Sequence, residues 1–402
     1  MIGQSVGETL RNGFYRWGWL IAVYLPLAGV AGRAAFNVVS GIYFLWAAAS
    51  MAATPGLAAH FREQRAFLVA YALMLLAWVL SLTQAADAGG GAYHLLRYVQ
   101  FSLTGVFTLV ALQQSPRQLA RLAGALALAA LLLIVLLYLE LPYYLWAVPF
   151  DPTMQLREDN LPWLLPFLLL ALANRGYRRW LIGATIVAFA VYIGLSQGRA
   201  ALLAMLVALA VFSALGFPMR RRYWVITGVG ILVIGILLGQ RFFRVRTAIG
   251  FNFATVDRFF SGRAGIWWQA LSSPPDNVWL GVGFGNLSSH LDILRTRIDI
   301  DEVAVKHLHN FVLDAWFETG LVGLSAFLVL LAVVIRHVSR VWPKLDTENR
   351  RAAAALLAAV AALLTAGLLS FSYASKQFSL YLYLLFAGLL VLRASGTRPA
   401  SP

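Results

Sequence analysis

The side chains of this chain that could bind or activate a substrate are few, and arginines stand out among them. Arg199 ends the polar segment Ser-Gln-Gly-Arg at 196–199, between two apolar runs. Arg263 follows Ser261 and Gly262, and a serine in this place is a suitable helix N-cap. We therefore predict that Arg263 lies in the first turn of a helix, where its guanidinium and the free backbone N–H groups can bind an anion together. For Arg199 we expect either an anion ligand or a side chain that extends to a membrane surface.

The strongest local pattern surrounds His309, which stands at the start of a long apolar run. Asp314 and Glu318 follow it and, being four residues apart, share one face of a helix. Glu318 lies about 13 Å beyond His309 along the helix and on its opposite side, so the two are poor direct partners. Acids inside a membrane span are costly and are usually paired or functional. We therefore expect Asp314 and Glu318 either to form structural ion pairs or to support a site at His309 and Asn310.

Three further motifs are weak signals for a metal or a phosphate. Asp299-Ile300-Asp301 has the spacing that many sugar transferases use for a divalent cation, but we interpret it as solvated surface. His307 and His309 are two residues apart and would not share a helix face, which disfavours a zinc pair. The three glycines at 281–285 lack the strand–turn–helix context of a nucleotide fold, so we interpret them as a structural turn. The sequence therefore predicts no metal site.

Composition identifies the elements that must position these residues. The chain has 402 residues, of which 60% are hydrophobic and 12% are charged. A soluble domain carries about 25% charged residues, so a water-soluble globule is excluded. The apolar runs are continuous instead of alternating, which excludes a β-barrel. We predict an all-α polytopic membrane protein, without disulfides or thiolate chemistry because the chain has no cysteine.

The apolar runs predict about 12 transmembrane helices, since each needs about 20 residues. They lie near residues 17–32, 34–53, 66–83, 93–113, 119–139, 161–173, 180–195, 200–216, 223–239, 310–335, 352–371 and 377–393. We interpret the first as an uncleaved span. Positive charges concentrate in alternate short connections, which places both termini in the cytoplasm. The net charge of +15 is then largely an orientation signal, and no nucleic-acid partner is expected.

The segment 240–308 is the exception among the connections, because it is long and lies on the non-cytoplasmic side. Its charges are mixed, and it contains Trp267, Trp268 and Trp279, whereas a disordered linker would be poor in aromatics. We predict a small folded cap that rests on the membrane between the ninth and tenth spans. The chain then divides into spans at 1–239, the cap at 240–308, and three spans with a cytoplasmic tail at 309–402.

Three segments in order form a longer pattern. They are Leu195-Ser-Gln-Gly-Arg199-Ala-Ala-Leu-Leu, the stretch from Ser261-Gly262-Arg263 through Trp267 to Gly281-Val-Gly283-Phe-Gly285, and His309-Asn310…Glu318-Thr-Gly320-Leu-Val-Gly323. Together with the number of spans, they resemble the O-antigen ligase/polymerase superfamily of bacterial envelope enzymes. The resemblance covers about residues 155–330 and the whole topology.

The resemblance implies a metal-independent membrane glycosyltransferase of the GT-C type that needs no cofactor. Its donor would be a glycan on undecaprenyl diphosphate at the periplasmic face of the bacterial inner membrane. In the ligase branch the acceptor is the lipid A–core oligosaccharide. The family's arginine and histidine roles fall on Arg199, Arg263 and His309. Arg157, in the outer loop 140–160, matches a further family arginine more loosely, and Asn310, Asp314 and Glu318 would support the site.

Charge stabilisation on the leaving diphosphate is what such a transfer requires, and guanidinium groups can supply it. We hypothesise a single displacement with inversion, with Arg199 and Arg263 on the diphosphate and His309 as the base that takes the acceptor proton. A histidine suits this role because its reference pKa of about 6.5 leaves it largely neutral near pH 7.

Other functions fit parts of the same pattern. A polymerase of the family would use the same donor and lengthen the glycan, and the residues alone do not separate it from a ligase. An oligosaccharyltransferase that modifies proteins is disfavoured, because no further domain follows Arg393. A transporter of lipid-linked sugars would predict ionisable residues in several spans and internal repeats. The polar residues instead concentrate at one face, which favours surface chemistry.

Overall fold

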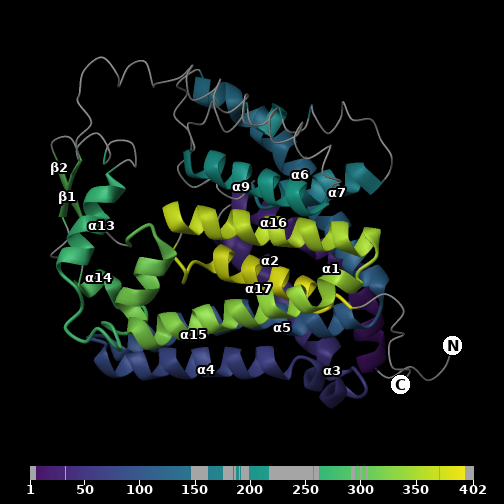
Figure 1. Cartoon of the computed structure of the whole chain (residues 1–402), viewed down its shortest axis with the longest axis horizontal. Coiled ribbons are helices and arrows are strands. Elements are labelled where there is room, and N and C mark those ends of the chain that lie inside the picture. Colours follow the sequence, from purple (N-terminus) through teal and green to yellow (C-terminus); the bar gives the residue numbers. More distant parts are fainter. Residues whose placement is uncertain are drawn as a thin grey trace.

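The computed structural model describes most of the chain and leaves several connections outside its described part. The described residues are 6–31, 33–145, 162–174, 199–216, 262–290, 295–298, 301–304, 307–370 and 372–393, with isolated positions at 184, 187–189, 191 and 257. Most described residues are helical, and the long helices run side by side (Figure 1).

The helices follow the apolar runs of the sequence, with a few short elements between them. The first group is α1 (Val6–Ala31), α2 (Arg33–Ala52), α3 (Leu57–Glu63), α4 (Arg65–Ser81), α5 (Ala88–Gln113), α6 (Pro116–Leu145), α7 (Leu165–Asn174) and α9 (Arg199–Gly216). The second is α13 (Arg263–Ser272), α14 (Leu287–His290), strands β1 (Arg295–Ile298) and β2 (Asp301–Ala304), α15 (Phe311–Val341), α16 (Thr347–Leu369) and α17 (Lys376–Leu390).

The predicted all-α polytopic membrane protein is confirmed, with one addition. Six helices of the described part are long and apolar enough to cross a membrane, and α9 and α17 are shorter apolar helices. The addition is a hairpin in which β1 and β2 pair antiparallel, with Arg295 opposite Ala304. The total of 12 spans stays a prediction, because the runs at 180–195 and 223–239 lie largely outside the described residues.

The first helix begins earlier than its apolar run. We expected a span from about residue 17, whereas α1 begins at Val6. Its polar first turns are held by the next helix, since Nη1 of Arg11 donates to the carbonyl of Ala53 at 3.1 Å and Trp46 Nε1 donates to the carbonyl of Leu10 at 3.0 Å. These contacts extend the helix beyond the segment that hydrophobicity alone marks.

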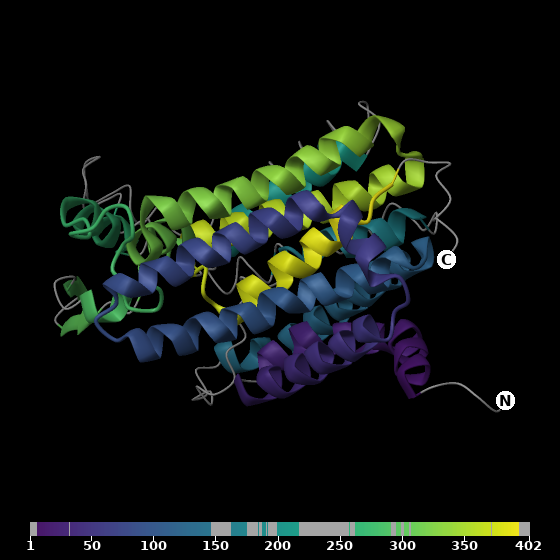
Figure 2. The ribbon, with the colours of Figure 1, turned by 90° about the horizontal axis from the view of Figure 1, so that it is seen from below.

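The bundle has two ends, which we name the α3 end and the α13 end after the elements found there (Figure 1). At the α3 end, α17 finishes where Gln64 donates to the carbonyl of Leu390 at 2.9 Å, and Arg393 forms an ion pair with Glu63. At the α13 end, α15 begins and α13 lies across the ends of the long helices instead of alongside them (Figure 1). The turned view keeps α13 at that same end (Figure 2).

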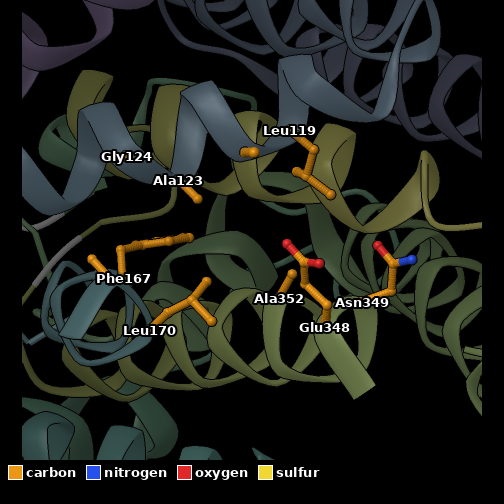
Figure 3. A pocket seen from close by; sticks show the side chains of 10 residues that line it. Leu119, Ala123, Gly124, Phe167, Leu170, Glu348, Asn349 and Ala352 are labelled. Carbon is orange, nitrogen blue, oxygen red and sulfur yellow. The ribbon is translucent and has the colours of Figure 1, made fainter. Parts of the chain in front are cut away.

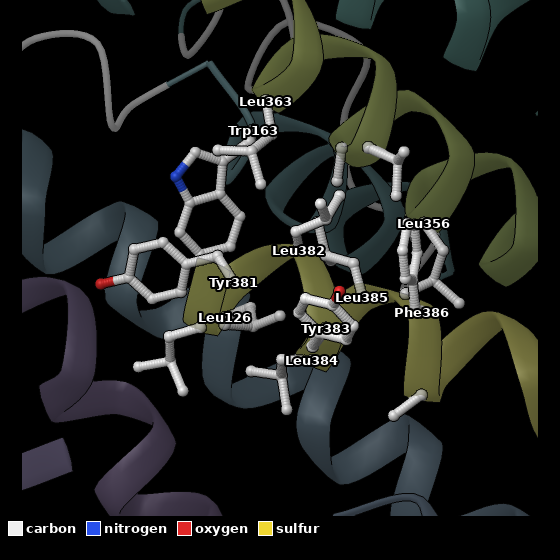
Figure 4. Close-up of a cluster of buried hydrophobic side chains, with 14 of the residues drawn as sticks. Leu126, Trp163, Leu356, Leu363, Tyr381, Leu382, Tyr383, Leu384, Leu385 and Phe386 are labelled. Atoms are coloured by element: carbon white, nitrogen blue, oxygen red, sulfur yellow. The ribbon is translucent and has the colours of Figure 1, made fainter. Parts of the chain in front are cut away.

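The core of the bundle is α17, which is surrounded by other helices. Every residue from Phe378 to Leu390 is buried, and Tyr381 packs against Trp163 with ring centroids 4.3 Å apart (Figure 4). At Gly105 of α5 a Cβ atom would lie 2.4 Å from the carbonyl oxygen of Tyr383, so a glycine allows α5 and α17 to approach closely. This packing fixes the connection between α16 and α17 at the α13 end.

Candidate functional site

The α13 end is organised by a break in α15 at Gly320. Gly320 has φ 63° and ψ −172°, so the helix ladder is interrupted nine residues after it begins. A neighbouring loop supplies the lost hydrogen bonds. Val282 N donates to the carbonyl of Phe317 at 2.8 Å, and the carbonyls of Val278 and Trp279 accept from the next two residues of α15 at 3.0 and 3.1 Å. A short first segment of α15, residues 311–319, is thereby set at the bundle end.

That loop contains the glycine triplet, and its structure confirms the interpretation as a structural turn. Gly281, Gly283 and Gly285 all have positive φ, and a Cβ atom at Gly281 would lie 2.4 Å from the carbonyl oxygen of Phe317. The backbone N–H groups at 281, 282, 284, 285 and 286 all donate to acceptors within the protein. These groups are therefore already used and do not form a phosphate-binding loop.

Glu318 joins this loop to the connection between α16 and α17. Its Oε2 accepts from the backbone N–H of Gly285 at 2.8 Å and from the hydroxyl of Tyr373 at 2.6 Å, and its carboxylate also accepts from the backbone of Leu287. Burial raises the pKa of Tyr373 well above its ordinary value, and the adjacent Glu318 raises it further, so this hydroxyl stays protonated and donates.

Asp314 is fully buried and holds the residue that precedes His309. Its Oδ1 accepts from the backbone N–H of Leu308 at 2.8 Å. The Ser372 side chain approaches the same carboxylate, while Oδ2 makes no hydrogen bond among the described residues. The ion pairs that we considered for Asp314 and Glu318 are absent from the described part of the chain. Both acids instead accept hydrogen bonds from N–H and O–H groups that sequence spacing does not reveal.

His309 adopts a left-handed conformation, with φ 53°, directly before α15. Asn310 is the N-cap of that helix, since its Oδ1 accepts from the backbone N–H groups of Val312 and Leu313 at 3.0 and 3.2 Å. Nδ1 of His309 lies 3.4 Å from the carbonyl oxygen of Ser370, which directly follows α16. A carbonyl oxygen only accepts, so this contact places a proton on Nδ1 and leaves the lone pair of a neutral imidazole on Nε2.

Arg263 is the first residue of α13, which confirms its predicted place in the first helical turn. The predicted N-cap Ser261 is wrong. The cap residue is Gly262, whose φ of 81° suits a glycine, and it makes no side-chain cap. The capping carboxylate comes from Asp257, which accepts from the backbone N–H of Gly265 at 2.6 Å. A carboxylate at a helix N-terminus is stabilised by the helix dipole, and this one is supplied from outside the local motif.

The helix of Arg263 is docked directly onto the segment of His309. Trp267, one turn after Arg263, donates from Nε1 to the carbonyl of Leu308 at 2.8 Å. Ile266 and Ala270 are buried against Leu308 in the same small apolar cluster. Leu308 is therefore bonded at its N–H by Asp314 and at its carbonyl by Trp267. This arrangement brings the α13 arginine helix and the histidine segment together at one end of the bundle.

Arg199, the first residue of α9, also lies at the α13 end. Gly216, the last residue of α9, lies beside Ala354 near the start of α16, and α9 runs alongside α16 (Figure 1). Arg199 is about 26 Å from Gly216 along the helix axis, which places it near the end of α16 that precedes Ser370. Arg157 lies outside the described residues.

The described part of the chain contains no group of three His, Asp or Glu residues that could hold a metal ion. Asp301 is the first residue of β2, and Asp299 lies outside the described residues. The argument from helix faces does not apply to His307 and His309. They precede the helix instead of lying on it, and their ring centroids are 4.0 Å apart.

A separate apolar cavity of about 310 Å³ lies between α6, α7 and α16 (Figure 3). Glu348 and Asn349, in the first turn of α16, are its polar lining residues. From there to Ser370 the helix runs about 30 Å, so this cavity is remote from His309.

For several residues of this site, the sequence predicted no role in it. They are Trp267, Ser370, Tyr373, Asn286 and Asp257. A partial signal existed for two of them. Asn286 follows the glycine triplet directly, and Ser370 opens the polar break between two apolar runs. Nothing in the sequence indicates which carbonyl Trp267 binds.

Part of the chain that includes residues of this site is similar to a known protein family. Residues 184–328 match the family described as O-antigen ligase. This match supports membership of the O-antigen ligase superfamily. No curated protein matches the chain.

The matched region contains most of the candidate site residues but not Ser370 and Tyr373. It includes Arg199, Arg263 and His309, together with Asn310, Asp314 and Glu318, whereas Arg157 precedes it. The domain and the six spanning helices identify the chain as a multi-pass membrane protein of a glycosyltransferase-like family.

Proposed function

We propose that this chain is an O-antigen ligase. It transfers an O-antigen glycan from undecaprenyl diphosphate to a sugar hydroxyl of lipid A–core, with inversion and without a metal ion. The reaction takes place at the periplasmic face of the bacterial inner membrane, which corresponds to the α13 end, and both termini are cytoplasmic.

The observation that supports this proposal most strongly is the contact between Trp267 and the carbonyl of Leu308. It joins the helix that begins with Arg263 to the residue before His309. Both lie inside the O-antigen ligase domain although they are far apart in the sequence. A cation and a potential base are thus held on one rigid unit, as a transfer between two large substrates requires.

The proposed step is one displacement at the anomeric carbon of the donor sugar. The acceptor hydroxyl forms the new C–O bond while the bond to the diphosphate breaks and its electron pair leaves with undecaprenyl diphosphate. Nε2 of His309 takes the hydroxyl proton. Arg199 and Arg263, with Arg157 as a further candidate, bind the diphosphate, because guanidinium groups stay cationic and donate paired hydrogen bonds to its oxygens.

The remaining residues hold this geometry. Asn310 caps the helix that follows His309, and Asp314 binds the backbone before it. Glu318 accepts hydrogen bonds from Gly285 of the glycine loop and from Tyr373, and so holds both in place. We assign Asn310, Asp314 and Glu318 as positioning residues and not as groups that touch the substrate.

The test is transfer by purified protein in the presence of EDTA, with a glycan on undecaprenyl diphosphate as donor and lipid A–core as acceptor. We expect transfer of a single glycan block. In Arg263→Ala the rate should fall about 10²–10³-fold, because one preorganised charge contact in the transition state is lost. Arg263→Lys keeps the positive charge but loses the planar guanidinium with its paired donors, so its transfer rate should lie between those of Arg263→Ala and the unchanged protein.

Arg97→Ala is the matched control. Arg97 belongs to α5 near the same end, and its guanidinium lies over the ring of Tyr93, 5.3 Å from the ring centroid. We expect this variant to transfer at the rate of the unchanged protein. Full activity of Arg263→Ala would remove Arg263 from the mechanism, and stepwise lengthening of the donor glycan would assign the chain to the polymerase branch.

A further inference from the structure

The helix α13 presents apolar side chains on its outer side as well as on its packed side. Ile266 and Ala270 are buried against the start of α15, whereas Trp268 and Leu271 are 64% and 54% exposed. A large exposed aromatic and a leucine three residues apart form an apolar face that water would not favour.

The glycine loop adds a second exposed apolar pair. Trp279 is 65% exposed and Val278 is 36% exposed. Both are fixed to α15 by backbone hydrogen bonds, in which Leu321 N donates to the carbonyl of Val278 and Val322 N donates to the carbonyl of Trp279. Their position relative to the spanning helix is therefore set by the main chain.

Leu321 and Val322 are the first residues of a stripe of exposed apolar side chains on α15 that faces lipid. The large exposed apolar residues of this helix are Leu321, Val322, Leu328, Val329 and Ile335. From Leu321 to Ile335 the stripe extends about 21 Å, and Arg336 follows it directly. The hydrocarbon core is about 30 Å thick, so Leu321 lies near its boundary at the α13 end. Trp279 is thus continuous with the lipid-facing surface at the depth where tryptophans are enriched.

The orientation of α13 agrees with such a position. The helix lies across the ends of the long helices, and hence in the plane of a membrane that they cross (Figure 1). A helix in that plane buries its apolar side at the boundary between headgroups and acyl chains.

We propose that Trp268, Leu271, Val278 and Trp279 form one membrane-contact surface that seats α13 on the lipid bilayer. Arg263, in the first turn of the same helix, is then held at the level of the lipid phosphates. With the proposed function, on which this last point rests, the arginine meets the diphosphate of the donor where its lipid anchor already lies.

The chain has no cysteine, so single-cysteine variants can report depth. We would attach a nitroxide label to Trp268→Cys, Leu271→Cys and Trp279→Cys in nanodiscs of phosphatidylethanolamine and phosphatidylglycerol. The measurement is the accessibility of the label to oxygen, which partitions into lipid, relative to a water-soluble nickel chelate. Leu328→Cys on the α15 stripe is the lipid control, and Ser288→Cys, an exposed position on α14, is the aqueous control.

We expect the ratio of oxygen to nickel accessibility at all three positions to exceed that of Ser288→Cys several-fold and to approach that of Leu328→Cys. A ratio at Trp268→Cys and Leu271→Cys equal to that of Ser288→Cys would overturn the proposal and show a water-facing aromatic surface, as expected for one that stacks on a sugar. The measurement needs no substrate, so it fails or succeeds independently of glycan transfer.

Discussion

His309 is held in a backbone conformation that a non-glycine residue rarely adopts. A left-handed conformation costs about 1–2 kcal/mol for an L-residue. The hydrogen bonds on both sides of it offset this cost, since Asn310 caps the helix that follows and Leu308 is bonded at its N–H and its carbonyl. Strain held in this manner is typical of functional sites. The imidazole is therefore directed by its neighbours and not by its own backbone preference.

Trp267→Phe should reveal this positioning. The substitution keeps an aromatic ring but removes the hydrogen bond to the carbonyl of Leu308. We expect kcat of the transfer reaction to fall about fivefold to tenfold with KM for the donor unchanged, because the loss of one hydrogen bond of about 1 kcal/mol loosens the segment of His309. His309→Gln removes the proposed base itself, so its kcat should be lower still, reduced about 10²-fold or more.

The control for this variant is Trp316→Phe. Trp316 packs against the same apolar cluster, and its Nε1 is buried without a hydrogen bond among the described residues. The same change of ring should leave kcat unaltered there. Equal losses of kcat in the two variants would mean that the packed ring matters and the hydrogen bond does not.

At the scale of elements, α15 consists of two helical segments that meet at Gly320, and a loop from elsewhere in the chain packs against the break. The break at Gly320 creates orphan backbone groups, and the loop at 278–282 satisfies them. Buried backbone groups without partners are costly in a membrane, so the break and the loop depend on each other. Asp314 and Glu318 lie on the short segment 311–319 at the bundle end, and the break separates this segment from the long part of α15.

Gly320→Ala should prevent this arrangement. A Cβ atom there would lie 2.1 Å from the carbonyl oxygen of Trp279, in addition to the unfavourable φ of 63°. We expect the free energy of unfolding to fall by more than about 3 kcal/mol, measured as thermal unfolding in detergent.

Gly56→Ala is a reference variant for the cost of an ordinary left-handed conformation without a close contact, since the ψ of Gly56 is 26° whereas that of Gly320 is −172°. Gly56 has a similar φ of 66°, but no atom lies within 4 Å of its Cβ position. Its loss should be only the conformational cost of about 1–2 kcal/mol. If both variants lost the same stability, neither the close approach between α15 and the loop nor the extended ψ of Gly320 would contribute.

At the scale of the whole molecule, the long described helices run between the α3 end and the α13 end (Figure 1). The α4–α5 connection reaches the glycine loop, where Asp87 N donates to Oδ1 of Asn286 at 2.8 Å. The start of α1 and the end of α17 both lie at the α3 end. With both termini cytoplasmic, as proposed, the candidate site faces the periplasm.

Orientation can be measured with the same cysteine-free chain. Ala86→Cys lies in the α4–α5 connection and Thr347→Cys opens α16, and both positions are exposed. In bacterial spheroplasts a membrane-impermeant maleimide should label Ala86→Cys and leave Thr347→Cys unlabelled until the membrane is opened. The reverse pattern would turn the candidate site toward the cytoplasm.

The sequence by itself determined the spanning helices of the described part, the place of Arg263 in a first helical turn and the place of His309 before a span, but it named Ser261 instead of Gly262 as the cap. These features follow from local hydrophobicity and from residue preferences at helix ends, which act over a few neighbouring positions. The same reasoning placed Asp314 and Glu318 on one helix face and interpreted the glycines as a turn.

Only the tertiary structure decided which groups meet. Asp257 caps α13, Trp267 binds the carbonyl of Leu308, and Glu318 accepts from Tyr373 instead of pairing with a cation. Each contact joins residues that are distant in the sequence or depends on a backbone break such as Gly320. Spacing fixes the relative position of residues within one helix, whereas the packing of several helices fixes which donors reach a buried acceptor.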